Sequence, residues 1–186
     1  MFWLKKMLRK HEIEKFEEKN PFLILNPRVP MEEEIGIKKE DVLEVYNNYV
    51  LLYLKEELKK LGFQQRGKAQ KYYLCLDYGI VAYIEIYRSI KSFSIFDVYC
   101  GFTCLSLELE RWSCKYGDSI LRYINRPPLY FDAKDEVVAK QSCEMIMWII
   151  QNKVLPLAES LKDFENAVQL LGKINNFGDW DSAPCL

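Results

Sequence analysis

The chain has 186 residues, a length that fits one domain, and 49% of them are hydrophobic. That much apolar material can bury a sizeable core, which excludes a chain that is disordered throughout. The formal net charge of −1 excludes the global basic field that steers many proteins onto nucleic acid.

Residues 1–19 are predicted to form a short charged helix. Lysines and an arginine interrupt its apolar residues, so we do not interpret it as a secretory signal peptide. Three prolines between positions 20 and 30 forbid a continuous helix and favour an irregular, extended connection. We therefore expect an N-terminal helix and extension at 1–36, a single domain at 37–174 and a flexible tail at 175–186.

The strongest helix prediction spans Glu40 to Leu61. Acidic residues lie at its start and lysines at its end, which complements the helix dipole, and Gly62 is suited to the left-handed position that follows many helices. Apolar residues recur at spacings of three and four and predict one buried stripe, formed by Val42, Val45, Tyr46, Tyr49, Leu52 and Tyr53.

Three strand-like stretches follow this helix: Lys71 to Asp77, Ile80 to Arg88, and Phe93 to Leu109. Tyr78-Gly79 is interpreted as the turn between the first two. The third is long for one strand, and Gly101 near its middle predicts a bulge or a strong bend. Short connections between consecutive strands predict an antiparallel meander.

The C-terminal part is predicted to be mostly helical. Trp112 to Phe131 has no clear pattern, and within it Ile120 to Ile124 is compatible with helix or strand. Asp135 to Leu155 has the pattern of a second long helix. Pro156 is expected to end or kink that helix. A short third helix is predicted from Leu161 to Leu171, with Gly172 as its end.

These elements together predict an α+β fold. We expect an antiparallel meander sheet of about three to five strands, with a long helix before it and two or more helices after it, packed mostly on one face. No apolar run reaches the roughly 18 residues that a membrane-spanning helix needs, so no membrane span is expected.

Catalytic and metal-binding patterns are scarce. His11 is the only histidine, which leaves little room for a triad or a histidine metal site. Cys100 and Cys104 would lie about 13 Å apart on a regular strand, too far to share a zinc ion. We expect no metal and no cofactor, and we interpret the six cysteines as mostly buried, reduced thiols of a cytoplasmic protein.

Glu85 and Asp97 flank the turn between the second and third predicted strands, with Arg88 beside it. A carboxylate pair among tyrosines can acquire raised pKa values and perform acid–base chemistry. This pattern supports one alternative function, an enzyme that handles a small molecule or nucleotide. The competing interpretation is that both carboxylates point into water from an exposed sheet face.

A basic cluster surrounds the turns at Gly62 and Gly67. It resembles a small anion-binding or nucleic-acid-binding patch, although the overall charge argues against nucleic acid as the partner. The competing interpretation is a solvated connection. The cluster consists of Lys59, Lys60, Arg66, Lys68 and Lys71.

Tyrosines on the central strands supply the preferred hypothesis for function. If the helices cover only one sheet face, Tyr83, Tyr87 and Tyr99 line the other, and tyrosine is a favoured anchor in protein interfaces. The competing interpretation is cross-strand aromatic packing. We expect a non-enzymatic, immunity-like or regulatory module that binds an unidentified protein partner.

Three stretches resemble the bacterial domain-of-unknown-function family 4304. They are Leu58-Lys-Lys-Leu-Gly-Phe63, Ile84-Glu-Ile-Tyr-Arg-Ser89 followed by Phe96 to Phe102, and Val154-Leu-Pro-Leu157 followed by Leu161-Lys-Asp-Phe164. The resemblance covers about residues 41–171. It implies a similar fold and a bacterial source but no catalytic residues, because the family has no established activity.

Overall fold

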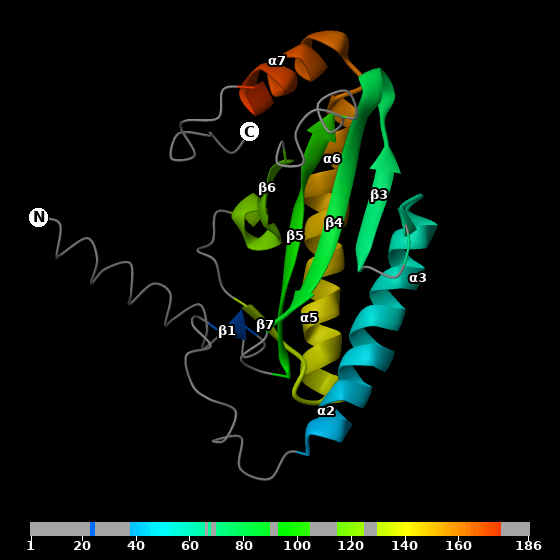
Figure 1. Cartoon of the computed structure of the whole chain (residues 1–186), viewed down its shortest axis with the longest axis vertical. Coiled ribbons are helices and arrows are strands. Elements are labelled where there is room, and N and C mark those ends of the chain that lie inside the picture. The colour runs from blue at the N-terminus through cyan, green and yellow to red at the C-terminus, as the bar shows by residue number, and fades with distance from the viewer. Residues whose placement is uncertain are drawn as a thin grey trace, which may run out of the picture.

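The computed structural model describes residues 23–24, 38–65, 67, 70–89, 93–104, 115–124 and 130–175. Within this part of the chain, an antiparallel sheet lies against a layer of helices, which pass behind the strands in Figure 1. The α+β fold class predicted from the sequence is confirmed.

The sheet contains seven described strands, all paired antiparallel, in the order β1-β7-β5-β4-β3-β2, with β6 also paired to β5. Consecutive pairing from β2 to β5 confirms the meander. Pairing of β1 with β7 adds two residues of the N-terminal extension to the sheet. The strands are β1 (Leu23–Ile24), β2 (Gln64–Gln65), β3 (Lys71–Cys75), β4 (Ile80–Arg88), β5 (Ile95–Cys104), β6 (Lys115–Ser119) and β7 (Tyr130–Asp132).

The β4–β5 pairing is regular along its whole length. It runs without interruption from Ile80 opposite Cys104 to Arg88 opposite Phe96. The bulge predicted at Gly101 is therefore wrong. Gly101 instead lies between Tyr83 of β4 and a second glycine, Gly117 of β6.

The first long helix begins at Lys39 and ends at Lys60, close to its prediction. It consists of α2 (Lys39–Val45), the π-helical segment η2 (Tyr46–Leu52) and α3 (Tyr53–Lys60). Its fully buried residues repeat every four positions: Val42, Tyr46, Val50, Leu54 and Leu58. A spacing of four drifts by about 40° per step on an ideal α-helix, and the wider turns of a π segment offset that drift.

This stripe differs from the predicted one at three positions. Tyr49, Leu52 and Tyr53 were expected in the core but are exposed, because the π segment turns the helix so that Val50 and Leu54 face the sheet instead. The prediction used an α-helical period throughout, and that period does not hold across residues 46–52.

The end of α3 forms a Schellman motif. The Phe63 amide donates to the Leu58 carbonyl over 3.0 Å, and the Gly62 amide donates to the Lys59 carbonyl over 3.0 Å. Gly62 has a φ of +90°, which glycine adopts without steric cost. The predicted role of Gly62 is confirmed.

The stretch that the sequence left undecided contains both kinds of structure. Its described residues form β6, the 3₁₀ segment η4 (Ile120–Ile124) and β7. Ile120, Leu121 and Phe131 are completely buried, so this short and mixed stretch contributes to the core.

The second long helix is also continued by a π segment. It consists of α5 (Glu136–Ile149), η5 (Ile150–Val154) and α6 (Leu155–Ser160). Pro156 was expected to end or kink it, yet the helix runs four residues further to Ser160. Proline provides no amide hydrogen for the preceding turn, and the π segment lies at that turn.

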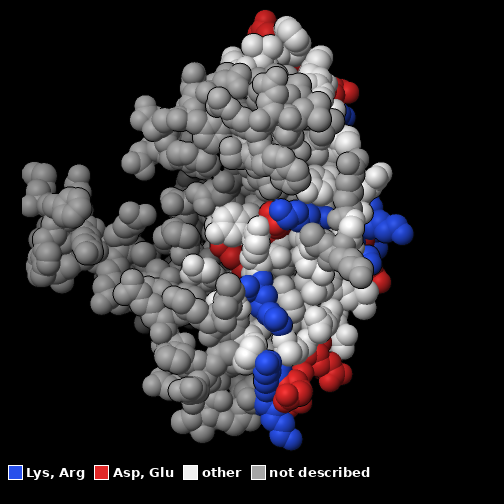
Figure 2. All heavy atoms as spheres, viewed as in Figure 1, with Lys and Arg blue, Asp and Glu red and all other residues white. Residues whose placement is uncertain are grey.

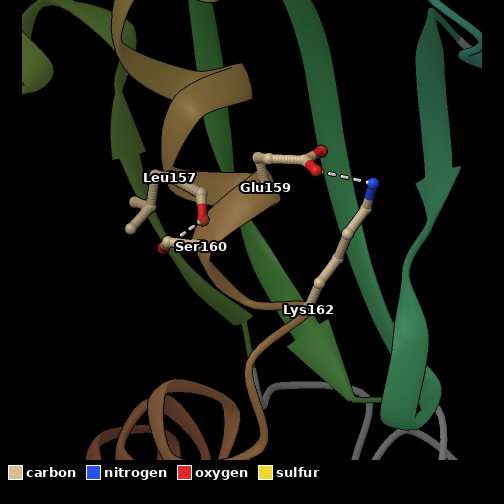
Figure 3. Close-up of polar contacts among 4 residues, drawn as sticks. All are labelled: Leu157, Glu159, Ser160 and Lys162. Carbon is tan, nitrogen blue, oxygen red and sulfur yellow. Dashed lines mark hydrogen bonds and ion pairs between the residues drawn. The ribbon is translucent and has the colours of Figure 1, made fainter.

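The last described helix, α7 (Phe164–Asn175), follows a short connection. Figure 3 shows the end of α6, where the Ser160 hydroxyl donates to the Leu157 carbonyl and Lys162 pairs with Glu159, each over 2.7 Å. Gly172 was expected to end the helix but lies inside α7, which continues to Asn175.

No helix in the described part of the chain is long and apolar enough to cross a membrane.

Candidate functional site: tyrosines and carboxylates on the outer sheet face

One face of the sheet packs on the helices, and we call the opposite one the outer sheet face. Residues alternate between the two faces, so Ile84 and Ile86 enter the core while Glu85 and Tyr87 lie on the outer sheet face. Glu85 is opposite Tyr99 and Tyr87 is opposite Asp97 on β5. The register thus brings two tyrosines and two carboxylates together.

Tyr87 and Tyr99 form an exposed aromatic pair. Their ring centroids are 5.5 Å apart and their planes meet at 85°, an edge-to-face contact. Tyr87 is 49% exposed and Tyr99 is 38% exposed, so each ring retains accessible surface after contacting the other.

A salt bridge on the neighbouring strands lies beside this pair. Lys71 of β3 lies opposite Glu85 of β4, and its ammonium nitrogen is 2.6 Å from the Glu85 carboxylate. The Tyr87 hydroxyl donates a hydrogen bond to Glu85, which raises the pKa of Tyr87 above its usual value. Lys71, Glu85 and Tyr87 therefore form one connected polar chain across two strands.

Asp97 lies at the other side of the aromatic pair and is buried. Its carboxylate accepts a hydrogen bond from the Ser119 hydroxyl of β6 over 2.9 Å and another from the Val98 amide over 2.7 Å. These contacts give the carboxylate a structural role in joining β5 to β6. Sequence reasoning missed Ser119 because its segment had no clear periodicity.

Arg88 does not join the two carboxylates. It pairs with Phe96, whose side chain is in the core, and its guanidinium lies 5.8 Å from the ring centroid of Tyr46 in the helix layer. Arg88 is thus on the opposite sheet face from Glu85 and Asp97. The catalytic group predicted from these three residues does not converge, because adjacent strand positions point to opposite faces.

The predicted tyrosine surface is smaller than expected. Tyr83 lies on the same face as Tyr87 but is only 6% exposed, so a partner cannot use it as an anchor in this conformation. Tyr87 and Tyr99 retain the accessibility that such a role requires.

The basic cluster is only partly described, since Arg66 and Lys68 lie outside the described residues. Lys60 pairs with Glu57 over 2.6 Å, and Lys71 pairs with Glu85. Lys59 is exposed on the last turn of α3. Figure 2 shows basic and acidic side chains interspersed on the visible described surface, which does not form a patch of one sign.

Among the described residues, no group of three or more histidine, cysteine and acidic side chains could hold a metal ion. His11, Cys114 and Cys185 lie outside this part of the chain. Cys100 and Cys143 are buried, as expected for inert thiols, and burial raises the pKa of each to about 12. Cys75 differs from that expectation, because it is exposed at the end of β3.

Comparison with known proteins finds no matching family model, no matching curated protein and no matching solved structure. The resemblance to family 4304 therefore stays a prediction, and the candidate site is argued from its geometry alone.

Proposed function

We propose that this protein is a non-enzymatic interaction module that binds a protein partner through Tyr87 and Tyr99 on the outer sheet face. The observation that carries the proposal is the exposed edge-to-face pair, held on two central strands. An immunity-like or regulatory role in the cytoplasm is consistent with such a module and is part of the proposal.

Preorganisation supports this use of the tyrosines. A side chain that is already ordered loses less conformational entropy on binding, and large aromatic rings supply much contact area with few rotatable bonds. The Tyr87 ring is held by Tyr99 at its edge and by the hydrogen bond to Glu85 at its hydroxyl. This arrangement is typical of an interface anchor.

The surroundings of Glu85 and Asp97 favour a binding surface over a catalytic site. Glu85 and Asp97 are buried, and each has a partner at hydrogen-bonding or ion-pair distance: Lys71 for Glu85 and Ser119 for Asp97. Arg88 lies on the other face of the sheet. We therefore do not advance the enzyme that the sequence suggested as an alternative.

Site-specific photocrosslinking in the native host tests the proposal. A photoreactive phenylalanine at position 99 is expected to form one dominant protein adduct, and Tyr87→Ala should reduce that adduct by about fivefold or more, the effect of losing over 1 kcal/mol. The same photoreactive residue at Phe164, which is exposed on α7, serves as the control.

Two results would contradict the proposal. One is an adduct whose yield does not change in Tyr87→Ala. The other is a loss of about 3 kcal/mol or more in the free energy of unfolding of Tyr87→Ala, which would mark Tyr87 as a core residue. We expect a loss of about 1 kcal/mol, the size of an exposed aromatic contact.

A further inference from the structure

Tyr87 and Tyr99 meet at nearly a right angle, so the faces of their rings form a corner on the outer sheet face. The ring planes cross at 85° with the centroids 5.5 Å apart, and the two side chains are 49% and 38% exposed. The face of an aromatic ring carries partial negative charge, so a cation in this corner is attracted by both rings. The corner is therefore suited to a positively charged group of a partner.

The hydrogen bond between Tyr87 and Glu85 strengthens this preference. A phenol that donates to a carboxylate is polarised by it, which makes the ring richer in electrons. That hydrogen bond is the main reason why the pKa of Tyr87 is raised, and the charge of Glu85 has a larger effect on the hydroxyl than the charge of Lys71. The ring therefore experiences a negative local field, although Lys71 lies 2.6 Å from Glu85.

Strand register places a carboxylate directly across from each ring. Glu85 of β4 is opposite Tyr99 of β5, and Tyr87 of β4 is opposite Asp97 of β5. Residues opposite one another on an antiparallel pair have their Cβ atoms about 5 Å apart, so each carboxylate borders the corner. Two carboxylates and two ring faces thus adjoin the one ammonium group of Lys71.

The shape of the corner favours arginine over lysine. A planar guanidinium that stacks on one ring is perpendicular to the other, and its N–H edge then points at the face of that second ring. Guanidinium is also more weakly hydrated than the compact ammonium of lysine, so it loses less when it leaves water for a ring face. The right angle between the rings matches this cation.

We propose that the corner between Tyr87 and Tyr99 binds an arginine side chain of the partner protein. This inference rests on the proposed function, for which it names the chemistry of the central contact. Arginine is enriched among the residues that contribute most to protein interfaces, where it commonly pairs with aromatic side chains.

An NMR titration of the full chain with isotope-labelled tyrosine rings tests the inference. The probe is a Gly-Gly-Arg-Gly-Gly peptide with blocked ends. The first control peptide carries citrulline, which retains the planar group without its charge, and the second carries lysine. At matched ionic strength, the ring signals of Tyr87 and Tyr99 should shift about two- to fivefold further with arginine than with citrulline, the effect of an exposed cation–π contact. Lysine should produce a smaller shift than arginine.

A second aromatic pair in the same chain is the matched control. Tyr78 and Phe164 also meet edge-to-face at 5.5 Å, and both are exposed, but the Tyr78 hydroxyl donates to the neutral carbonyl of Lys162. Arginine should therefore shift the Tyr78 signal less than the Tyr87 signal. Equal shifts at both pairs would mean that arginine is attracted to any exposed ring, and the inference would be wrong.

Two variants locate the contact. Tyr99→Leu removes one wall of the corner and should reduce the arginine shift at Tyr87 to the level of the citrulline control. Tyr87→Phe retains the ring without its hydrogen bond to Glu85 and should reduce the arginine shift at Tyr99 by a smaller factor. Circular dichroism verifies that each variant is folded. An undiminished shift at Tyr87 in folded Tyr99→Leu would contradict the inference.

Failure of this inference and failure of the proposed function have different signatures. A crosslinked adduct that depends on Tyr87, together with equal shifts for arginine and citrulline, would overturn the arginine contact and leave the proposed function standing. An arginine-selective shift without an adduct that depends on Tyr87 would overturn the proposed function and, with it, a protein partner as the source of the arginine.

Discussion

At the scale of single residues, burial raises the pKa values of three ionisable side chains. Burial raises the pKa of Tyr46 to about 12, against a smaller opposing effect of Arg88. Burial also raises the pKa of Cys100 and of Cys143 to about 12. Because the thiolate is the reactive form, both thiols are unreactive at neutral pH.

The raised pKa of Tyr46 predicts a loss of stability in alkali. The unfolded side chain ionises at its usual pKa of 10.0, whereas the folded one remains protonated up to about 12. Its contribution is complete below pH 10 and falls by about 1.4 kcal/mol per pH unit until pH 12. Urea unfolding from pH 9 to 12 should show a shallower decline for Tyr46→Phe.

The buried cysteines are present in both proteins of that experiment, so their ionisation cancels in the comparison. Equal pH dependence of the wild type and Tyr46→Phe would contradict the assigned cause. The comparison uses the free energy of unfolding at each pH, because Tyr46→Phe also removes a hydroxyl at every pH.

Secondary-structure elements of this protein adjust their geometry to keep a continuous core. Both long helices include a π segment, η2 in the first and η5 in the second. In the first helix the π segment directs Val50 and Leu54 to the sheet. It thereby leaves Tyr49 and Tyr53 exposed.

The start of α5 provides a test at the level of one element. The Asp135 carboxylate accepts a hydrogen bond from the Val138 amide over 2.9 Å, which satisfies one otherwise unpaired donor of the first turn. Asp135→Ala should lower the free energy of unfolding by about 1 kcal/mol. Asp135→Ser retains an accepting oxygen and should lose much less; equal losses would show that the cap is unimportant.

At the scale of the whole molecule, the β3–β4 turn holds the C-terminal helix. Tyr78 has a φ of 57°, which is unusual for a bulky residue. Its hydroxyl donates to the Lys162 carbonyl over 3.4 Å, and its ring lies edge-to-face with Phe164 at 5.5 Å. The strained turn thus places a ring against Phe164 at the start of α7 and a hydroxyl against Lys162, 84 residues after Tyr78.

Loss of that ring should loosen α7 selectively. Tyr78→Ala removes contacts worth roughly 1 kcal/mol, so amide hydrogen exchange in α7 should accelerate about fivefold. Tyr78→Phe retains the ring contact and should show a smaller change. Amides of α5 provide an internal reference, and equal acceleration in both helices would indicate global destabilisation instead of local release.

Much of the fold could be predicted because the deciding signals are local. The strand-like stretch from Ile80 to Arg88 forms β4, and Gly62 marks a helix end that the Schellman motif confirms. Local periodicity failed at Tyr49, where a π segment changes the number of residues per turn. It also failed at Gly172, because an interior glycine in a helix is unfavourable but not forbidden.

By itself, the sequence determined the α+β class, the meander and the presence of tyrosines and carboxylates on its central strands, since these follow from residue type and spacing. Only the tertiary structure decided which of them meet. Strand register placed Tyr87 against Tyr99 and Lys71 against Glu85, and put Arg88 on the opposite face. Packing buried Tyr83 and exposed Tyr49. Both outcomes depend on contacts between distant segments, which no local pattern encodes.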